Sequence, residues 1–506
     1  MLQIADIFQR GMILQRDKQV KVWGTNTPGA EIIGKIQGKE GMTITDPDGN
    51  WELEIPNLDT SEDEIFVISS GDITVTLTDV AVGEVWVAGG QSNMEFWMRY
   101  EKHKESALKD CPNKRIRFFD VPEVCYDGQL EEFDYSREAS WRQATEDDLE
   151  YFSAVGYYFQ KELEKALDVP VGIIGCNWGG TLSRAWMEPE TVRAVGEPWM
   201  KDYEDQAANM DMEEYWKGQH YSPMNDKGNP FADPFGEFVL SKTPTPEEVQ
   251  EFFDQIPGNL DEFLNMPQPQ QIPGSLYEHM LKKIAPYSIQ GFLWYQGESD
   301  DVPGKNVLYK DMMTGLISDW RKLWGEEEMP FIIVQLPGFG KWLLGAETNQ
   351  FPVIRKCQEL VSDTVKSTYL CSISDSGEEN DIHPKNKKVV GERLALLARG
   401  HVYGEDILCD APRAKAVARE GRRLTFRFDH AEGGLKIVDG DLTELRIYSN
   451  EREVGYKAWA DGNQLILELE SCIEGKLKVE FAQTPWFRVN LYNQAGIPAI
   501  PFQFVF

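Results

Sequence analysis

Between residues 81 and 402, short apolar segments alternate with stretches of helical periodicity, and this alternation restricts the fold more than any other feature of the chain. Parallel strands need a long crossover, usually a helix, so the alternation predicts a parallel sheet covered by helices on both faces. The expected strands are 84–88, 115–119, 171–175, 288–294, 331–335 and 368–373. The clearest expected helices are 152–167 and 307–324.

The two ends of the chain have a different pattern, typical of antiparallel β structure. Segments such as 20–24, 51–55, 423–428 and 464–469 alternate apolar and polar residues or are β-branched. Turn residues separate the segments of the first 80 residues, which favours a small sandwich. A chain of 506 residues is too long for one ordinary domain. We therefore expect an N-terminal β domain (1–80), an α/β domain (81–402) and a C-terminal β domain (403–506).

Residues from about 187 to 275 interrupt the α/β pattern. They are rich in Asp, Glu, Pro, Asn and Met and contain helical pieces such as 246–256, but no strand of the sheet is evident. Two interpretations remain open for this insertion: a helical cap that borders an active site, or a charged surface excursion without function.

Composition restricts the partners and the compartment. Hydrophobic residues make up 41% of the chain, enough for a sizeable core, and the formal net charge is −33. Nucleic acids and anionic membranes need clustered Lys and Arg, so both are disfavoured as partners. The seven cysteines form no CxxC pair and show no Cys/His spacing suited to zinc, which favours thiols in a reducing compartment. With no signal-peptide pattern and no apolar run near ~20 residues, we expect a cytoplasmic protein.

The candidate site residues all follow expected strands. In an open α/β sheet, ligands bind beyond the carboxyl ends of the strands. Four post-strand loops carry small, polar or titratable residues, and they contain Ser92 (Gly-Gln-Ser-Asn), Gly180 (Trp-Gly-Gly-Thr), Gln296 (Gln-Gly-Glu-Ser-Asp) and His383 (Asp-Ile-His-Pro). Their convergence at one edge of a sheet predicts a catalytic site.

These residue types suit acyl transfer, which needs a nucleophile, a base and donors for an oxyanion. Ser92 lies on the turn after 84–88, where the alternative role is a helix N-cap. Of six histidines, only His383 lies in a post-strand loop with a carboxylate, Asp381, two residues away. Pro384 favours an extended backbone at His383, which can turn both side chains to one side. The alternative for His383 is a surface loop residue.

The oxyanion donors expected from the same loops are the backbone N–H groups of Ser92 and Gly180 and the side-chain amide of Gln296. Taken singly, the glycines could form only a turn, and Gln296 could be a buried hydrogen-bonding amide. The Gly-x-Ser-x-Gly elbow of α/β-hydrolases is absent, because residue 94 is Met. That fold is therefore disfavoured.

The four blocks, 90–94, 178–181, 294–300 and 381–384, resemble in sequence and order the sialate O-acetylesterase-like branch of the SGNH (GDSL-like) hydrolases. The resemblance implies a flavodoxin-like, three-layer α/β/α domain with a parallel sheet, flanked by β-sandwich-like regions and carrying a helical insertion. It implies a serine carboxylesterase that removes O-acetyl groups from carbohydrates and needs no metal or cofactor. By motif position it implies Ser92 as nucleophile, His383 as base, Asp381 as its partner, and an oxyanion hole of Ser92, Gly180 and Gln296.

Substrate contacts are expected from Trp178 and Trp186, which flank the glycine pair, and from Arg184 and Glu298. Core packing is the alternative for the two tryptophans. Asp375 and Glu298 are lower-ranked alternatives to Asp381 as partner of His383.

The substrate is expected to be an acetylated mono- or oligosaccharide, and whether the chain forms a homodimer is left open. A sialate carboxylate would need a cation such as Arg184 or Arg99, whereas the acidic chain favours neutral acetylxylan or acetylmannan oligosaccharides. Two other classes stay open: a non-catalytic glycan-binding protein and a long-chain esterase. We expect activity to fall below about pH 6 as His383 becomes protonated.

Overall fold

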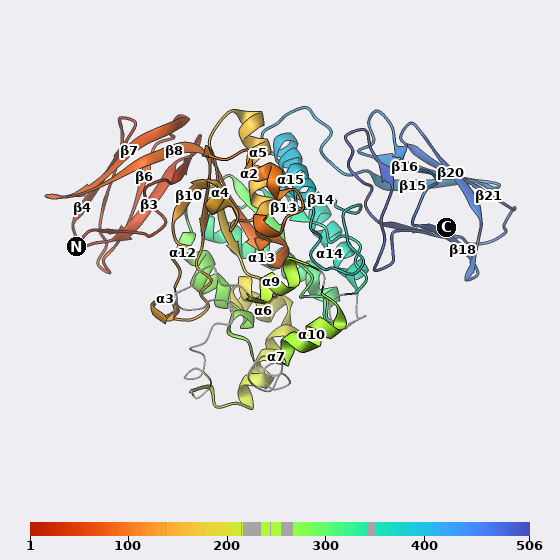
Figure 1. Cartoon of the computed structure of the whole chain (residues 1–506), viewed down its shortest axis with the longest axis horizontal. Helices are drawn as coiled ribbons and strands as arrows, with labels where there is room; N and C mark the ends of the chain where they lie inside the picture. Colours follow the sequence, from red (N-terminus) through yellow and green to blue (C-terminus); the bar gives the residue numbers. More distant parts are fainter. Residues whose placement is uncertain are drawn as a thin grey trace. The chain divides into compact units, whose positions relative to one another are not determined.

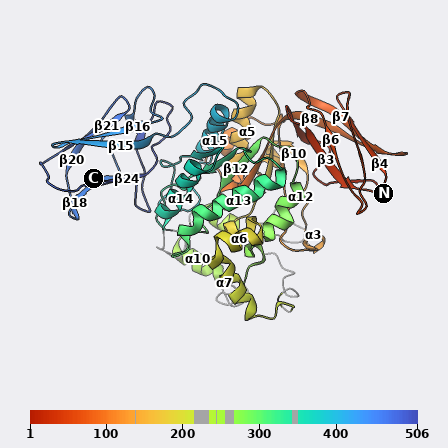
Figure 2. The same cartoon turned by 180° about the vertical axis from the view of Figure 1, so that it is seen from behind.

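The computed structural model of the chain describes residues 1–132, 134–136, 138–213, 215, 234–242, 244–254, 267–341 and 350–506. Figures 1 and 2 label its helices and strands. The chain divides into two compact units. The first consists of Met1–Lys242, Pro257–Gln296 and Asp311–Phe331, and the second of Thr243–Ile256, Gly297–Lys310 and Ile332–Phe506.

The first unit begins with the β structure expected for residues 1–80. One sheet has the order β1-β3-β6, and β8 connects β2 and β7, with β4 and β5 beyond β7. Burial alternates along β6, as its sequence predicts, so that its apolar residues face inward. The bounds are β1 (Gln3–Ile4), β2 (Ile13–Gln15), β3 (Val20–Thr25), β4 (Glu31–Ile36), β5 (Lys39–Ile44), β6 (Asn50–Ile55), β7 (Ser61–Ser70) and β8 (Ile73–Gly90).

Strand β8 joins this β region to the α/β part of the first unit. Its first half pairs with β7, and its second half pairs with β11 (Val171–Asn177) and β12 (Gly291–Tyr295). The domain boundary predicted at residue 80 therefore falls inside a single 18-residue strand. The sequence suggested a break there because the pattern changes from alternating to continuously apolar, and that change marks only the point where β8 becomes buried on both faces.

The α/β part of the first unit has the strand order β10-β9-β11-β8-β12, with β9 (Asn113–Asp120) parallel to β11 and β10 (Trp141–Ala144) antiparallel to β9. Trp86 packs against Phe159 of α5 (Ala154–Leu167) on one face. A Cβ on Gly89 would overlap the Trp320 ring of α13 (Tyr309–Trp324), so this helix packs closely on the strand there. Gly89 and Trp86 face opposite sides of the sheet because side chains alternate along a strand. Helices thus cover both faces, as the β–α alternation predicts.

The second unit contains β13 (Phe331–Val334) beside β14 (Thr368–Cys371), with α14 (Phe351–Thr364) and α15 (Lys388–His401) packed on β14. Arg355 of α14 donates to the carbonyl oxygens of Pro337 and Thr484, at 3.0 and 2.7 Å. Its guanidinium also lies over the Phe487 ring, 4.6 Å from the centroid. These contacts fix the α/β part of this unit to its C-terminal β region.

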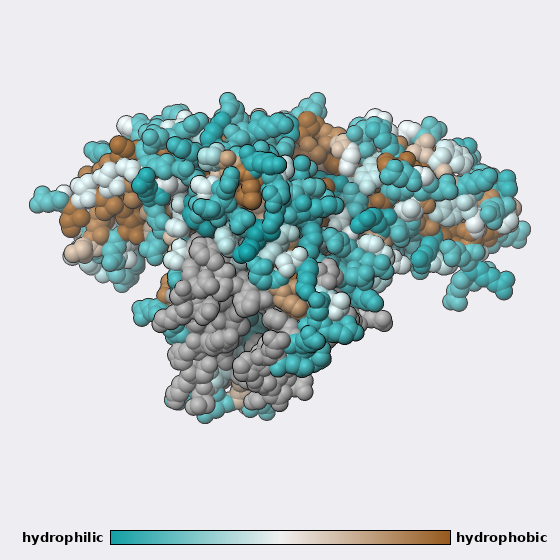
Figure 3. Space-filling model, in the orientation of Figure 1, coloured by the Kyte–Doolittle hydropathy of each residue, from teal (hydrophilic) through white to brown (hydrophobic). Residues whose placement is uncertain are grey.

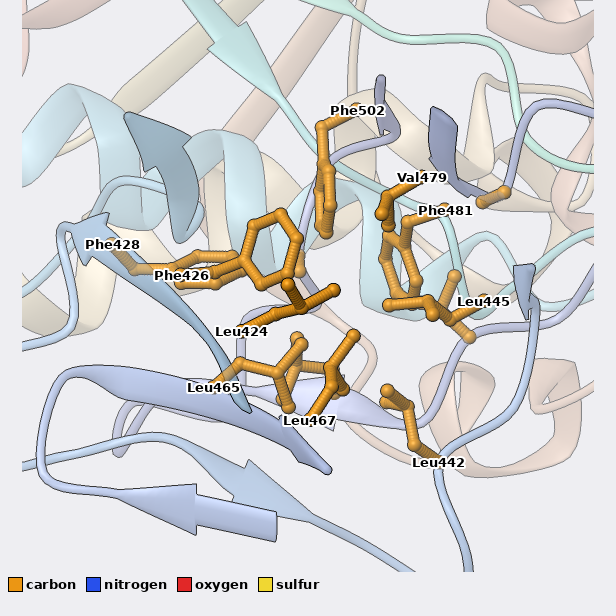
Figure 4. Packing of buried hydrophobic residues seen from close by; sticks show 14 of the residues in the cluster. Leu424, Phe426, Phe428, Leu442, Leu445, Leu465, Leu467, Val479, Phe481 and Phe502 are labelled. Atoms are coloured by element: carbon orange, nitrogen blue, oxygen red, sulfur yellow. The ribbon is translucent and has the colours of Figure 1, made fainter. Parts of the chain in front are cut away.

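The C-terminal region is a β-sandwich, as predicted. Its two four-stranded sheets have the orders β15-β16-β21-β20 and β19-β18-β22-β24, and β17 pairs with β23. Apolar side chains from both sheets, including Phe426, Leu467 and Phe481, form one core (Figure 4). The bounds are β15 (Arg413–Glu420), β16 (Arg423–Asp429), β17 (Lys436–Ile437), β18 (Leu445–Ser449), β19 (Arg452–Glu453), β20 (Tyr456–Asp461), β21 (Gln464–Leu469), β22 (Lys478–Phe481), β23 (Leu491–Tyr492) and β24 (Phe502–Val505).

The insertion expected at 187–275 is helical where it is described, with α6 (Pro189–Val195), α7 (Glu197–Ala208), α9 (Pro234–Leu240) and α10 (Pro246–Phe253). Residues 214, 216–233, 243 and 255–266 of this segment lie outside the described residues. Short helices elsewhere are α1 (Ser92–Glu95), α2 (Lys104–Leu108), α3 (Gln129–Glu132), α4 (Glu146–Leu149) and α12 (Lys282–Ile284).

Hydrophilic residues predominate on the face shown in Figure 3, with apolar patches over the N-terminal strands. Large apolar residues exposed on those strands are Met42, Ile44, Ile65 and Ile73. All seven cysteines fall in the described residues and none is in a disulfide, as their sparse distribution predicts. Among the described helices, none has the length and apolar character needed to cross a bilayer.

Candidate active site

Three of the four predicted loops leave the sheet of the first unit at the same level. Gly90 at the end of β8 lies opposite Asn177 at the end of β11 and opposite Tyr295 at the end of β12. Because these strands are parallel, the residues that follow them emerge at one edge. The predicted convergence of the loops that carry Ser92, Gly180 and Gln296 is therefore confirmed.

The turn that carries Ser92 depends on a glycine in a conformation that other residues rarely adopt. Gly90 has φ +137°, and a Cβ at this position would overlap the Tyr295 carbonyl oxygen. The backbone N–H of Gln91 donates to that same oxygen at 3.1 Å. Ser92 then begins the short helix α1 and is partly buried. The glycine and the Tyr295 carbonyl thus fix the point at which the serine leaves the sheet.

The Gly179–Gly180 pair serves two different needs. A Cβ on Gly179 would lie 3.4 Å from Ser92 Cβ and 3.0 Å from Glu95 Oε2, so the missing side chain lets this loop pack directly against the serine. Gly180 has φ +73°, and a Cβ there would meet no other described residue, so this glycine is needed for its backbone conformation. The two loops predicted to share a site are therefore in contact at Ser92.

Two glutamine side chains hold the Gly180 loop. Gln296, which is fully buried, donates from Nε2 to the Thr181 carbonyl oxygen at 3.2 Å. Gln271 donates to the Gly180 carbonyl oxygen at 2.5 Å and accepts from the Leu182 N–H at 2.9 Å. The sequence analysis did not identify Gln271, which lies about 90 residues away in the insertion and belongs to no recognisable motif. The oxyanion roles of Gly180 and Gln296 stay predictions.

Asp381 and His383 lie in the second unit, in the loop between β14 and α15. Asp381 Oδ1 accepts the backbone N–H of His383 at 2.8 Å, which is a local Asp turn of the kind that short acidic side chains form. The same oxygen lies 3.8 Å from His383 Nδ1, beyond hydrogen-bond length. Asp381 is therefore next to the imidazole, as predicted, and it fixes the His383 backbone rather than the ring.

Buried charge surrounds His383. Burial, together with the positive charges of Lys387 and Lys385, lowers the pKa of His383 well below the 6.5 that is usual for histidine. Burial also lowers the pKa of Lys387 to about 7, against the opposing charge of Glu298. Lys385 Nζ pairs with Asp381 Oδ2 at 3.0 Å. The sequence analysis did not use these lysines, although the basic run 385–388 directly after His383 was a visible signal.

The carboxyl of Asp381 has a raised pKa because it is buried, although Lys385 and the His383 N–H oppose the rise. The alternative partner Asp375 is committed elsewhere: Arg393 donates to both of its oxygens, at 2.7 and 2.8 Å. Burial opposes ionisation of Asp375, but the two Arg393 hydrogen bonds outweigh it and its pKa is lowered. Asp381 and Glu298 stay the predicted partners of His383.

For Trp186 and Arg184, the structure favours packing roles over the predicted substrate contacts. Trp186 has no exposed surface; its Nε1 donates to Thr181 Oγ1 at 3.0 Å and its ring packs edge-on against Trp294. Arg184 is buried and donates to the carbonyl oxygens of Gln271 and Trp199 at 2.8 and 2.9 Å. Trp186 therefore holds the Gly180 loop through Thr181, and Arg184 holds Gln271, which in turn bonds to that loop. Substrate contacts by Trp178 and Glu298 stay predictions.

Comparison with known proteins gives one consistent answer. Residues 260–398 match the family model described as "Carbohydrate esterase, sialic acid-specific acetylesterase". The chain is 24% identical to the sialate O-acetylesterase of Mus musculus, over 99% of this chain and 94% of that protein, and 23% identical to that of Homo sapiens, over 99% and 92%. It is also similar to the crystal structure of XAC1771, a carbohydrate acetylesterase from Xanthomonas citri, with a TM-score of 0.75, 25% identity and 99% of both chains covered.

The α/β fold and the similarity to that acetylesterase structure support a hydrolase of the SGNH class. The similarity to carbohydrate acetylesterases extends over the whole length of the chain, β regions included. The chain is a carbohydrate O-acetylesterase that resembles the sialate O-acetylesterase-like branch of that class.

Proposed function

We propose that this carbohydrate O-acetylesterase cleaves acetyl esters of sugars through an acyl-enzyme on Ser92. The observation that carries the proposal is the close approach of Gly179 to Ser92, where an added Cβ would lie 3.4 Å from Ser92 Cβ. It occurs at the ends of β8 and β11, which lie level with the end of β12. This arrangement brings a hydroxyl, a glycine turn and the Gln296 loop to one edge of a sheet. That is the set of groups that ester hydrolysis by a serine needs.

In this mechanism the His383 imidazole accepts the Ser92 hydroxyl proton as the oxygen attacks the acetyl carbonyl carbon. The N–H groups of Ser92 and Gly180 and the Gln296 amide donate to the oxyanion. The oxyanion collapses, the bond to the sugar oxygen breaks, and that oxygen takes the proton from His383 and leaves as a hydroxyl. Water then attacks the acetyl-serine by the same path and releases acetate.

The lowered pKa of His383 supports its role as base. A base must be unprotonated at the start of the reaction, and an imidazole with a pKa well below 6.5 is neutral at pH 7. Asp381, buried beside it, would stabilise the imidazolium that forms during the attack.

The test is hydrolysis of p-nitrophenyl acetate and of acetylated oligosaccharides by wild type and by Ser92→Ala. We expect kcat/KM to fall by about 10⁴-fold or more, the loss typical of a removed serine nucleophile. Ser106→Ala is the matched control, because Ser106 is an exposed serine in α2. Equal rates for wild type and Ser92→Ala would overturn the proposal and favour a glycan-binding protein.

We infer a preference for neutral acetylated sugars over sialic acid, because both arginines that could recognise a sialate carboxylate are engaged by other groups. Arg184 is held by backbone carbonyls. Arg99 pairs with Glu237 at 2.6 Å and lies over the Tyr151 ring. Mass spectrometry of deacetylation across acetylated sialo-, xylo- and manno-oligosaccharides tests this preference. Faster release from the sialo-oligosaccharides would contradict it, and faster release from octanoyl than from acetyl esters would favour a long-chain esterase.

A further inference from the structure

The second unit contains a cluster of metal-ligating side chains that the ester chemistry does not use. His401 ends α15, Cys409 and Asp410 follow in the next loop, and their donor atoms all lie within 4.8 Å of one another. His430, directly after β16, places its Nδ1 atom 3.8 Å from Asp410 Oδ2. We propose that His401, Cys409, Asp410 and His430 bind one zinc ion.

The separations of the other three donors from Asp410 are close to those of a tetrahedral zinc site. With Zn–N and Zn–O bonds near 2.0 Å and a Zn–S bond near 2.3 Å, the donors should lie about 3.3 to 3.6 Å apart. The distances to Asp410 Oδ2 are 2.9 Å from His401 Nε2, 3.8 Å from Cys409 Sγ and 3.8 Å from His430 Nδ1. His401, Cys409 and Asp410 therefore form the preformed part of the site, and the exposed His430 imidazole would turn toward the ion as the fourth ligand.

The residues around the cluster hold its loops in place. Asn493, which is buried, donates from Nδ2 to the carbonyl oxygens of both Asp410 and His430, at 3.0 Å each. The Tyr369 ring stacks on the His401 imidazole with a centroid distance of 4.1 Å. A Cβ on Gly400 would overlap Cys409 Sγ, so a glycine is needed where the sulfur approaches α15. Packing and hydrogen bonds thus fix three of the four donor residues before any metal binds.

The chemistry of the donors favours zinc over the hard cations. Two imidazoles, a thiolate and one carboxylate are a nitrogen- and sulfur-rich set, whereas Mg²⁺ and Ca²⁺ select oxygen ligands. Binding converts the Cys409 thiol to a zinc-bound thiolate and the His401 imidazolium, which pairs with Asp410, to a neutral ligand, and both protons pass to the solvent. A cavity of about 430 Å³ lined by His401, Asp410 and His430 gives the ion a path of entry.

The proposed ion would connect α15 to the C-terminal sandwich, because three donors belong to α15 and the loop after it and the fourth follows β16. Its role is therefore structural, and it revises the expectation from sequence that no metal binds. The spacing 401, 409, 410 and 430 matches no compact zinc motif, which is why the site could not be recognised from sequence.

The proposal is tested by loading the purified full chain with Zn²⁺, removing excess ion and measuring bound metal by mass spectrometry. Loading with Co²⁺ in place of Zn²⁺ provides a thiolate-to-cobalt charge-transfer band as a direct readout. We expect about one ion per chain, and both signals should be lost in Cys409→Ser. His430→Gln, the variant least expected to disturb folding because His430 is exposed, should weaken binding by about 100-fold or more.

Cys472→Ser and His103→Gln are matched controls, because they remove one exposed thiol and one imidazole outside the cluster. Both should bind metal as the wild type does. Zinc should raise the melting temperature of the wild type and leave that of Cys409→Ser unchanged. Less than one tenth of an ion per chain in the loaded wild type, or a cobalt band that persists in Cys409→Ser, would overturn the proposal.

Discussion

The loop around Ser92 and the loop around His383 are built by different means. Backbone contacts and glycines form the first: Gly90 against the Tyr295 carbonyl, Gly179 against Ser92, and an amide on Thr181. Burial and charge form the second, where His383 and Lys387 are buried near Asp381 and Lys385. The first loop should therefore tolerate changes in pH but not a side chain added at Gly90 or Gly179, whereas the second should respond to the loss of a single charge.

Removing the base should have the largest effect on the charged loop. His383→Ala is expected to lower kcat/KM for acetyl esters by about 10²- to 10⁴-fold, the usual contribution of a general base. Steady-state kinetics with p-nitrophenyl acetate measures it, with His103→Ala as the control because His103 lies at the start of α2. A loss of less than tenfold would remove His383 from the mechanism.

On the side of Ser92, the matching test of a predicted catalytic group is Gln296→Met. This substitution keeps the length of the side chain and removes the amide. The loss of one oxyanion donor is expected to cost about 10²- to 10³-fold in kcat. Gln160→Met is the control, since Gln160 is another fully buried amide of the first unit. If both variants lose activity equally per folded molecule, Gln296 has only a structural role.

Substitutions of Gly90 and Gly180 separate two reasons for a glycine: close packing of a neighbouring backbone and a positive φ. Gly90→Ala adds a Cβ that overlaps the Tyr295 carbonyl, so we expect a loss of about 3 kcal/mol or more in the free energy of unfolding. Gly180→Ala meets no neighbouring atom in the described part of the chain and carries only the strain of a positive φ, about 1 kcal/mol. Urea denaturation measures both, and equal losses would show that Gly90 is not tightly packed.

The smallest expected effect is a shift in pH dependence. Lys387 lowers the pKa of His383, so Lys387→Met should raise that pKa and move the acid limb of kcat/KM to higher pH. Lys388→Met is the matched control, because Lys388 is the exposed neighbour. An unchanged limb in Lys387→Met, or the same shift in both variants, would contradict the electrostatic account of this loop.

In the wild type, the acid limb of the pH profile of kcat/KM should lie below the value of about pH 6 that was expected from the sequence. Burial favours the neutral imidazole, and the neighbouring lysines add to this effect. Sequence alone could not predict the shift, since it depends on how deeply His383 is buried.

The fold was largely predictable because its signals are local. Segments such as 85–88 and 171–175 are continuously apolar, and they lie inside β8 and β11. Helix α14 was not predicted, since its buried face includes Arg355 and Gln358, whose polarity masks the apolar periodicity. Strand β10 was missed because only the two ends of Trp141–Ala144 are buried.

The place of a side chain was predictable where its motif follows a strand, as for Ser92 and His383, whose catalytic roles stay predictions. It was not predictable where a partner arrives from elsewhere in the chain. Gln271 reaches the Gly180 loop from the insertion, and Asn493 reaches Asp410 from the C-terminal sandwich. Trp186 has the sequence context of a pocket residue, yet its burial against Trp294 gives it a core position. Such partnerships depend on tertiary packing, which a single sequence does not encode locally.

The most direct test of the central claim is covalent labelling with a small alkyl fluorophosphonate, followed by peptide mass spectrometry. We predict one adduct per chain, on Ser92, at a rate at least about 100-fold slower in His383→Ala because the serine then lacks its base. An adduct on another residue, or continued ester hydrolysis with Ser92 unlabelled, would contradict the account.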